Sequence, residues 1–219
     1  MQKLVLVVDD FGMSYYPPFK SFGPCATNPS ILQTAPEKVG LVVFTGGSDV
    51  TPSFYGENCN DKTQCNPKRD EREAKVFNRA RELELPIAGI CRGSQFICAM
   101  SGGKLVQHLN RHNQYHDLLT DDGRRIFVSS THHQMQLPPE GAVAVAWSDP
   151  RRSDIYEGPN GVTYEPDREH DVVYYPSTNA LGMQYHPEYM DEASDGFRYC
   201  AELVERFFGV GKVMHEHEV

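Results

Sequence analysis

The chain has 219 residues, which is enough for one domain with a substantial buried core and too few for two large domains without a clear linker. Its 21 basic and 30 acidic side chains give a formal charge of −9, which would repel a phosphate backbone and an anionic membrane surface. No apolar stretch approaches the roughly 20 residues of a membrane-spanning helix. We therefore expect a single domain over residues 1–219, with neither nucleic acid nor a membrane as its partner.

The six cysteines are too sparse and too irregularly spaced to resemble a disulfide framework, so a reducing, cytoplasmic setting fits best. The first residues lack a small-residue cleavage site and predict a first strand rather than a signal peptide. No spacing among the cysteines and the nine histidines matches a zinc site. We accordingly predict no metal and no cofactor.

Three apolar runs predict buried strands over Leu4–Val8, 41–44 and Ile87–Ile90, because they are short, rich in β-branched residues and continuous rather than alternating. Between the second and third run, Asn66-Pro67 opens a helix with an apolar stripe formed by Val76, Phe77, Ala80 and Leu83. This strand–helix–strand crossover predicts an α/β fold with a mostly parallel sheet flanked by helices.

The second half of the chain predicts a short helix after Cys91 that ends at Gly102-Gly103, and a closing amphipathic helix over 197–208. Later strands are expected at 143–147, 172–175 and 181–185. Two segments, 11–36 and 149–170, show no periodicity and receive no assignment, and the tail 211–219 is expected to be disordered.

Residues 89–95 read Gly-Ile-Cys-Arg-Gly-Ser-Gln and stand between a predicted buried strand and a predicted helix. A sharp strand-to-helix turn raises one side chain above the sheet, and the glycines two positions on either side permit the crowded backbone. At a helix N-terminus the peptide dipoles favour the thiolate of Cys91. The alternative for Cys91 is a buried, inert cysteine, which is the role we expect for Cys98.

A cysteine nucleophile needs a base and a group that orients the base. His186-Pro187-Glu188 supplies both after an apolar run, so the histidine is expected at the end of a strand, where open α/β sheets build their sites. A histidine at a loop entrance is more often a surface group. Together with the turn around Cys91, however, the pattern predicts a catalytic pair.

The turn at 89–95 together with His186-Pro187-Glu188 resembles the class I glutamine amidotransferases. Within them, the γ-glutamyl hydrolase and γ-glutamyl-γ-aminobutyrate hydrolase branch is the most similar. It also resembles the chain at Phe44–Glu57, at Arg69-Asp70, at 102–107 and at His132-His133-Gln134. The similarity is dense from about residue 39 to 109 and covers roughly half of the chain. It implies a flavodoxin-like α/β fold.

The resemblance implies a thioester mechanism in which Cys91 attacks the γ-amide of glutamine or of a γ-glutamyl compound, His186 relays protons and Glu188 holds the imidazole. It further implies an oxyanion hole formed by the backbone N–H groups of Gly47 and Arg92.

Gly46 and Gln95 are then expected at the substrate. A simple tight turn at Gly46 and a backbone-capping role for Gln95 are the alternatives. His132 and His133 stay outside the predicted catalytic set, and strand alternation would let at most one of them face substrate.

Two enzymatic functions remain open: a free-standing γ-glutamyl hydrolase, or a glutaminase subunit that passes ammonia to a synthetase on another chain. An inactive binding member of the fold is a third possibility, which the retention of Cys91, His186 and Glu188 disfavours. The irregular segments 11–36 and 148–176 depart from the family pattern, so substrate specificity does not transfer. The sequence also leaves open whether the chain forms a homodimer.

Overall fold

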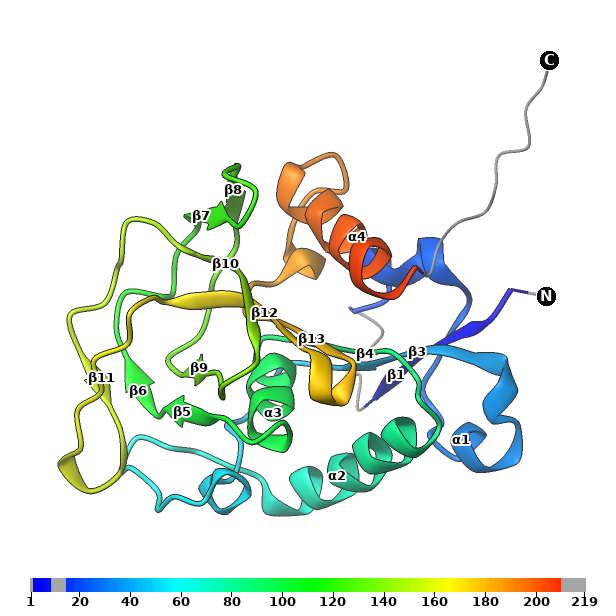
Figure 1. The fold of residues 1–219 in the computed structure, drawn as a ribbon, viewed down its shortest axis with the longest axis horizontal. Coiled ribbons are helices and arrows are strands. Elements are labelled where there is room, and N and C mark those ends of the chain that lie inside the picture. Colours follow the sequence, from blue (N-terminus) through cyan, green and yellow to red (C-terminus); the bar gives the residue numbers. More distant parts are fainter. Residues whose placement is uncertain (1, 9–14, 210–219) are drawn as a thin grey trace.

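The structure is a computed structural model that describes residues 2–8 and 15–209. Within these residues, nine strands form one sheet in the order β2-β1-β3-β4-β13-β12-β10-β7-β8 (Figure 1). Its parallel half contains β2 (Cys25–Ala26), β1 (Leu4–Val8), β3 (Val39–Phe44), β4 (Ile87–Ile90) and β13 (Ala180–Met183). Its antiparallel half continues with β12 (His170–Tyr175), β10 (Val143–Ser148), β7 (His116–Thr120) and β8 (Arg125–Val128).

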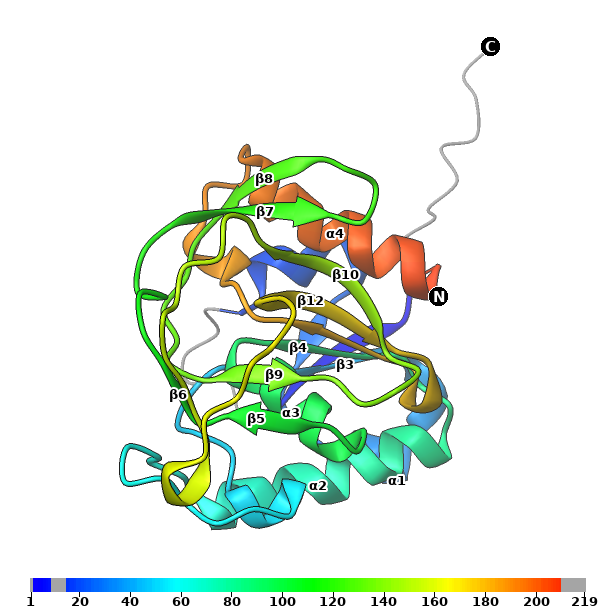
Figure 2. The ribbon, with the colours of Figure 1, turned by 60° about the vertical axis from the view of Figure 1, so that its left-hand side comes forward.

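Helices cover the two faces of the sheet (Figure 2). One face carries α1 (Ile31–Thr34), α2 (Pro67–Glu82) and α3 (Arg92–Met100), and the other carries α4 (Asp195–Phe208) with the 3-10 helix η1 (Pro17–Phe22). Successive side chains of a strand point to opposite faces, so Val5 and Val7 of β1 pack on the α4 side while Leu6 and Val8 pack on the α2 side. The predicted α/β fold class is confirmed.

The predicted helices form where their end signals stand. The side chain of Asn66 accepts a hydrogen bond from the Arg69 N–H at the start of α2, and Pro67 occupies its first turn. Ser194 caps α4 in the same way, and Gly209 ends that helix in the left-handed conformation. These local signals place the two longest helices.

Several strands escaped prediction because they are short or have one exposed face. They are β7 and β8, the pair β5 (Lys104–Val106) with β9 (Met135–Leu137), and the pair β6 (His108–Leu109) with β11 (Tyr156–Glu157). The strand expected at 181–185 ends instead at Met183, because the chain leaves the sheet there and carries Gln184, Tyr185 and His186 into a loop.

The two unassigned segments contain little regular structure. From residue 15 to 36 the chain forms η1, β2 and α1, and 149–170 contains β11, η4 (Pro159–Gly161) and the first residue of β12. The remaining 3-10 turns are η2 (Pro36–Lys38), η3 (Pro52–Tyr55), η5 (Pro176–Thr178) and η6 (Pro187–Tyr189). Residues 11–14 and the tail 211–219 lie outside the described residues. Across 2–8 and 15–209, no helix is long and apolar enough to cross a membrane.

Candidate active site

Three parallel strands end side by side where the site is built. The Gly46-Gly47 loop follows β3, Cys91 follows β4 and His186 lies in the loop after β13. β4 pairs with both β3 and β13, and Ile90 is in register with Met183. The Cys91 N–H donates a hydrogen bond of 2.7 Å to the Met183 carbonyl, which continues the hydrogen-bond ladder between β4 and β13 by one bond into the site.

Cys91 has an unusual backbone conformation for a residue with a side chain, with φ 52° and ψ −111°. Neighbouring glycines make that conformation possible. A Cβ on Gly89 would lie 2.5 Å from the Gly93 carbonyl, and one on Gly93 would lie 2.2 Å from the Phe44 carbonyl oxygen. The turn predicted around Cys91 is present, and the thiol lies at the N-terminus of α3.

His186 is held by its backbone and by its ring. Its Nδ1 lies 2.6 Å from Oε1 of Glu188. The Ser129 hydroxyl donates to the His186 carbonyl (2.6 Å), and the His186 N–H donates to the Ser129 oxygen (3.2 Å). The Tyr189 ring stacks on the imidazole with a centroid distance of 4.6 Å. Because Nδ1 is bound to Glu188, Nε2 is the atom left to exchange a proton with Cys91.

The electrostatic environment favours a protonated His186. Burial alone would lower its pKa, but the Cys91 sulfur and the Glu188 carboxylate outweigh burial and raise the pKa to about 10. The same surroundings act on Tyr15, whose pKa is raised by burial and by the proximity of Glu188 and Cys91. An imidazolium beside a sulfur is the arrangement that stabilises a thiolate.

The cysteines differ in their expected reactivity, and alkylation measures the difference. Burial raises the pKa of Cys98 to about 12 and also raises that of Cys200. We expect iodoacetamide to label Cys91 much faster than either, because thiolate fraction and access control alkylation. Peptide mapping after a short exposure measures the order, with the exposed Cys59 as an accessible thiol for comparison. Faster labelling of Cys98 or Cys200 would contradict an activated thiol at 91.

The Gly46-Gly47 loop approaches the site closely. The Gly46 N–H donates to the Tyr15 hydroxyl (3.1 Å), and a Cβ on Gly46 would lie 2.5 Å from that oxygen and 3.4 Å from the His186 ring. Within the described part of the chain, the N–H groups of Gly47 and Arg92 have no acceptor. Two free N–H donors on either side of a thiol are what an oxyanion hole requires.

A cavity of about 260 Å³ opens over Cys91, slightly below the usual size of drug-like pockets. Its lining comprises Gly47, Ser48, Asp49, Gln64, Cys91, Arg92, Gln95, Thr131, His132, His133 and Gln134. The Gln95 side chain is buried and donates through Nε2 to the Gln134 carbonyl (3.1 Å) and to Gln184 Oε1 (3.2 Å). Both amide hydrogens are used, so Oε1 is the atom of Gln95 that can meet a ligand.

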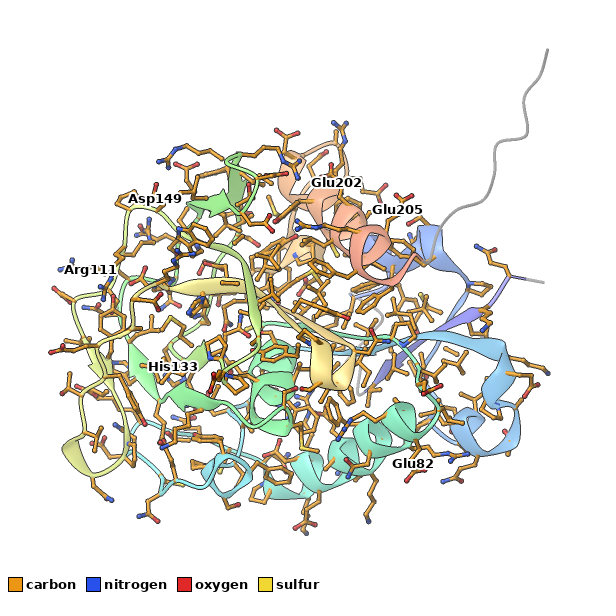
Figure 3. The ribbon with its side chains drawn as sticks, in the orientation of Figure 1. Glu82, Arg111, His133, Asp149, Glu202 and Glu205 are labelled. Atoms are coloured by element: carbon orange, nitrogen blue, oxygen red, sulfur yellow. The ribbon has the colours of Figure 1, made fainter. Side chains whose placement is uncertain are left out.

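Both adjacent histidines line this cavity, whereas strand alternation was expected to let at most one of them face substrate. The reason is that 131–134 is irregular rather than a strand, and strand alternation does not apply. His132 is buried, with Nδ1 2.8 Å from the Gln134 carbonyl, and burial holds its pKa well below the usual range. His133 lies beside β6 and β9 (Figure 3) and its Nε2 is 3.1 Å from Asp49 Oδ1, which raises its pKa.

The structure brings together all the sequence-predicted site residues: Cys91, His186, Glu188, Gly46, Gly47, Arg92 and Gln95. Sequence reasoning missed Tyr15 and Ser129, which bind Gly46 and His186 respectively. Neither stands in a motif or a periodic segment. It also gave Arg69-Asp70 no role beyond opening α2.

Comparisons with known proteins point to one family. A family model described as Peptidase C26 matches residues 22–155. A protein of Lactococcus lactis named as glutamine amidotransferase-like is 30% identical over 159 residues, 68% of this chain and 66% of its own length. The γ-glutamyl-γ-aminobutyrate hydrolase of Escherichia coli K12 is 30% identical over 190 residues, 74% of this chain and 68% of its own. The chain thus spans about two thirds of the length of these two relatives.

Solved structures agree on the fold. A Thermoplasma acidophilum protein described as part of a GMP synthase superposes with a TM-score of 0.65 at 15% identity, over 96% of this chain and 94% of its own. A glutamine amidotransferase of Thermotoga maritima gives a TM-score of 0.58 at 18% identity, over 96% and 95%. From the family model and the relatives together, the chain belongs to the Peptidase C26 family, in the γ-glutamyl hydrolase branch of the class I glutamine amidotransferase-like proteins.

Proposed function

We propose that this chain is a cysteine-dependent hydrolase that cleaves the γ-amide of glutamine or of a γ-glutamyl compound, with Cys91, His186 and Glu188 as its catalytic residues. One observation carries the proposal. Cys91 leaves β4 in a strained turn beside β13, and the loop after β13 carries the buried pair of His186 and Glu188 at 2.6 Å. Nucleophile, base and orienting carboxylate are thereby assembled from adjacent strands.

The proposed reaction has two stages. The Cys91 thiolate attacks the γ-carbonyl carbon, and the oxyanion that forms accepts hydrogen bonds from the Gly47 and Arg92 N–H groups. The C–N bond then breaks as protonated His186 gives its proton to the departing nitrogen, which leaves a γ-glutamyl thioester on Cys91. In the second stage His186 takes a proton from water, the hydroxide attacks the thioester carbonyl, and glutamate leaves as the C–S bond breaks.

The cavity has groups suited to the amino-acid end of such a substrate. Asp49 Oδ1 and His133 Nε2 are paired at its wall, and Gln95 offers a carbonyl oxygen. An α-ammonium group needs acceptors such as Asp49 or Gln95 Oε1, and an α-carboxylate needs a donor such as His133. The E. coli and Lactococcus names are consistent with this substrate class.

The alternative function, a glutaminase subunit that delivers ammonia to a separate synthetase, is favoured by one surface. Tyr115, Phe127 and Tyr189 are 48%, 57% and 57% exposed, and Tyr189 stacks on His186. Tyr115 and Phe127 stack on each other, and the Tyr115 hydroxyl lies 3.5 Å from the Tyr189 carbonyl. Exposed aromatic side chains beside a catalytic residue suit either a partner protein or the leaving group of a substrate.

Turnover by the isolated chain separates the two functions. A free hydrolase is expected to release glutamate from at least one γ-glutamyl compound on the order of once per second or faster. The panel comprises glutamine, γ-glutamyl-γ-aminobutyrate, γ-glutamyl-putrescine and polyglutamate, each assayed for free glutamate with and without cell extract.

Negligible rates that extract restores with glutamine would favour the partner-dependent subunit. Rates that stay negligible on every substrate, with and without extract, would contradict the proposed function.

A further inference from the structure

Four charged side chains are completely enclosed beneath the site. Arg69, Asp70 and Glu73 of α2 are 2%, 0% and 0% exposed, and Arg92 of α3 is 1% exposed. Arg69 Nε lies 2.8 Å from Glu73 Oε1, and the Arg92 guanidinium binds both Glu73 and Asp70. We call these four residues the buried charge cluster. Its two positive and two negative charges cancel.

Such a cluster is a poor way to stabilise a fold. Taking a charge out of water is unfavourable, and a protein with well-packed apolar side chains of similar volume in place of the charges is often as stable or more stable. What a buried charged network can provide instead is a fixed arrangement of the backbone groups that it binds. The contacts of the buried charge cluster show which backbone groups it holds.

Arg69 binds the loop that carries the first predicted oxyanion donor. Its Nη1 donates to the Gly46 carbonyl (3.0 Å), and its Nη2 lies 3.3 Å from the Thr45 carbonyl and 3.1 Å from the Thr45 hydroxyl. The contact is tight, because a Cβ on Gly47 would lie 2.1 Å from Nη1. Glycine is therefore required at 47, where φ is +138°.

The Gly46 carbonyl and the Gly47 N–H belong to the same peptide unit. That unit is trans, so the two groups point in opposite directions. By holding the carbonyl on the α2 side, Arg69 turns the Gly47 N–H away from α2, on the side of the loop where Gly47 lines the cavity with Cys91. A positive charge on the carbonyl oxygen also polarises the peptide, which makes its N–H a stronger donor.

The other end of the cluster holds the second predicted donor. The Arg92 side chain is bound to Glu73 and Asp70, and the Arg92 N–H follows directly after the nucleophile. Asp70 in addition accepts from the Thr51 N–H at 2.8 Å, which ties down the chain beyond the Gly46-Gly47 loop. A single network thus fixes both sides of the predicted oxyanion hole.

We propose that the buried charge cluster, through Arg69, permanently sets the Gly46–Gly47 peptide with its N–H toward Cys91, so that the oxyanion hole is complete without a partner protein. Arg69 is then a positioning residue of the reaction. This inference rests on the proposed function, and within it favours the free hydrolase over the partner-dependent subunit.

Steady-state kinetics of Arg69→Met and Arg69→Lys test the proposal, with the γ-glutamyl compound that the panel shows to be turned over. Arg69→Met keeps an unbranched side-chain stem but lacks the guanidinium, so it cannot bind the Gly46 carbonyl. We expect its kcat to fall on the order of 10²-fold with KM nearly unchanged, as for loss of an oxyanion-hole donor. Arg69→Lys retains the charge and one donor, and its kcat is expected to lie between those of Arg69→Met and the wild type.

Two further measurements exclude a merely structural role. Iodoacetamide labelling of Cys91 forms no oxyanion, so its rate in Arg69→Met is expected to match the wild type. Arg81→Met, at an exposed position on the same helix, is the matched control and is expected to keep wild-type kcat. If Arg69→Met does not fold cooperatively, Arg69→Lys decides.

Wild-type kcat in an Arg69 variant that folds would overturn the inference, and so would a loss of labelling in parallel with kcat. Absence of γ-glutamyl hydrolysis by the wild type is a different result, since it would contradict the proposed function itself.

Discussion

Replacement of Cys91 by alanine is expected to lower the release of glutamate by on the order of 10⁴-fold or more, since no other group can form the thioester. The fold should remain intact because the side chain is small and lies at the cavity rather than in the centre of the core. Measurement of kcat/KM on the best substrate of the panel, together with a thermal unfolding curve, checks both statements.

Cys98→Ala is the matched control, because Cys98 lies on the same helix and is completely buried away from the cavity. It removes a sulfur of the same kind and should cost stability rather than chemistry. Substantial hydrolysis by Cys91→Ala, or a comparable loss in Cys98→Ala without unfolding, would remove Cys91 from the mechanism.

Replacement of His186 by alanine is expected to be nearly as damaging as loss of the nucleophile, because the thiolate loses its counter-ion and the leaving nitrogen loses its proton donor. The substitution also leaves the enclosed carboxylate of Glu188 without its partner, which destabilises the fold. His186→Asn is a useful companion, since an amide can still bind Glu188 but cannot exchange protons. Activity near the wild-type level in either folded variant would exclude His186 as the base.

Glu188→Gln should be milder, because the imidazole it orients is still present, and its pH dependence is the sharper readout. The pKa of His186 is raised from 6.5 to about 10, so the protonated form, and the stability it contributes, is fully present below about 6.5 and is lost as pH rises through about 10. We therefore expect kcat/KM of the wild type to fall near pH 10. Loss of the Glu188 charge should shift this fall in kcat/KM to lower pH. A fall at the same pH in Glu188→Gln would contradict the role of Glu188 in raising the pKa of His186.

The sequence predicted the main residues of the candidate site because each stands in a short, contiguous motif whose chemistry can be interpreted locally. Cys91 is flanked by the glycines that its backbone needs, and His186 and Glu188 are two residues apart after a strand. The α/β fold followed from strands buried on both faces, which form continuous apolar runs.

The supporting residues could not be predicted, because their roles depend on pairings distant in the sequence. Tyr15 reaches Gly46 from a proline-broken segment, and Ser129 binds His186 across 57 positions. Asp70 and Glu73 near the start of α2 bind Arg92 of another helix, a pairing that no local pattern in the sequence indicates. Strands β7 and β8 alternate between buried and exposed residues and lack the apolar runs on which the prediction relied.

The hydrogen bond from the Cys91 N–H to the Met183 carbonyl has a consequence for how the sequence of such a protein can change during evolution. Cys91 and the loop that carries His186 start from two adjacent strands, whose separation of about 4.8 Å is a property of any sheet. Loops that line the cavity, such as 131–134, can therefore change in length or composition without altering the distance between these two strands. In this architecture the residues proposed to carry the chemistry and the loops that would select the substrate are separate parts of the chain. One can therefore be retained while the other changes.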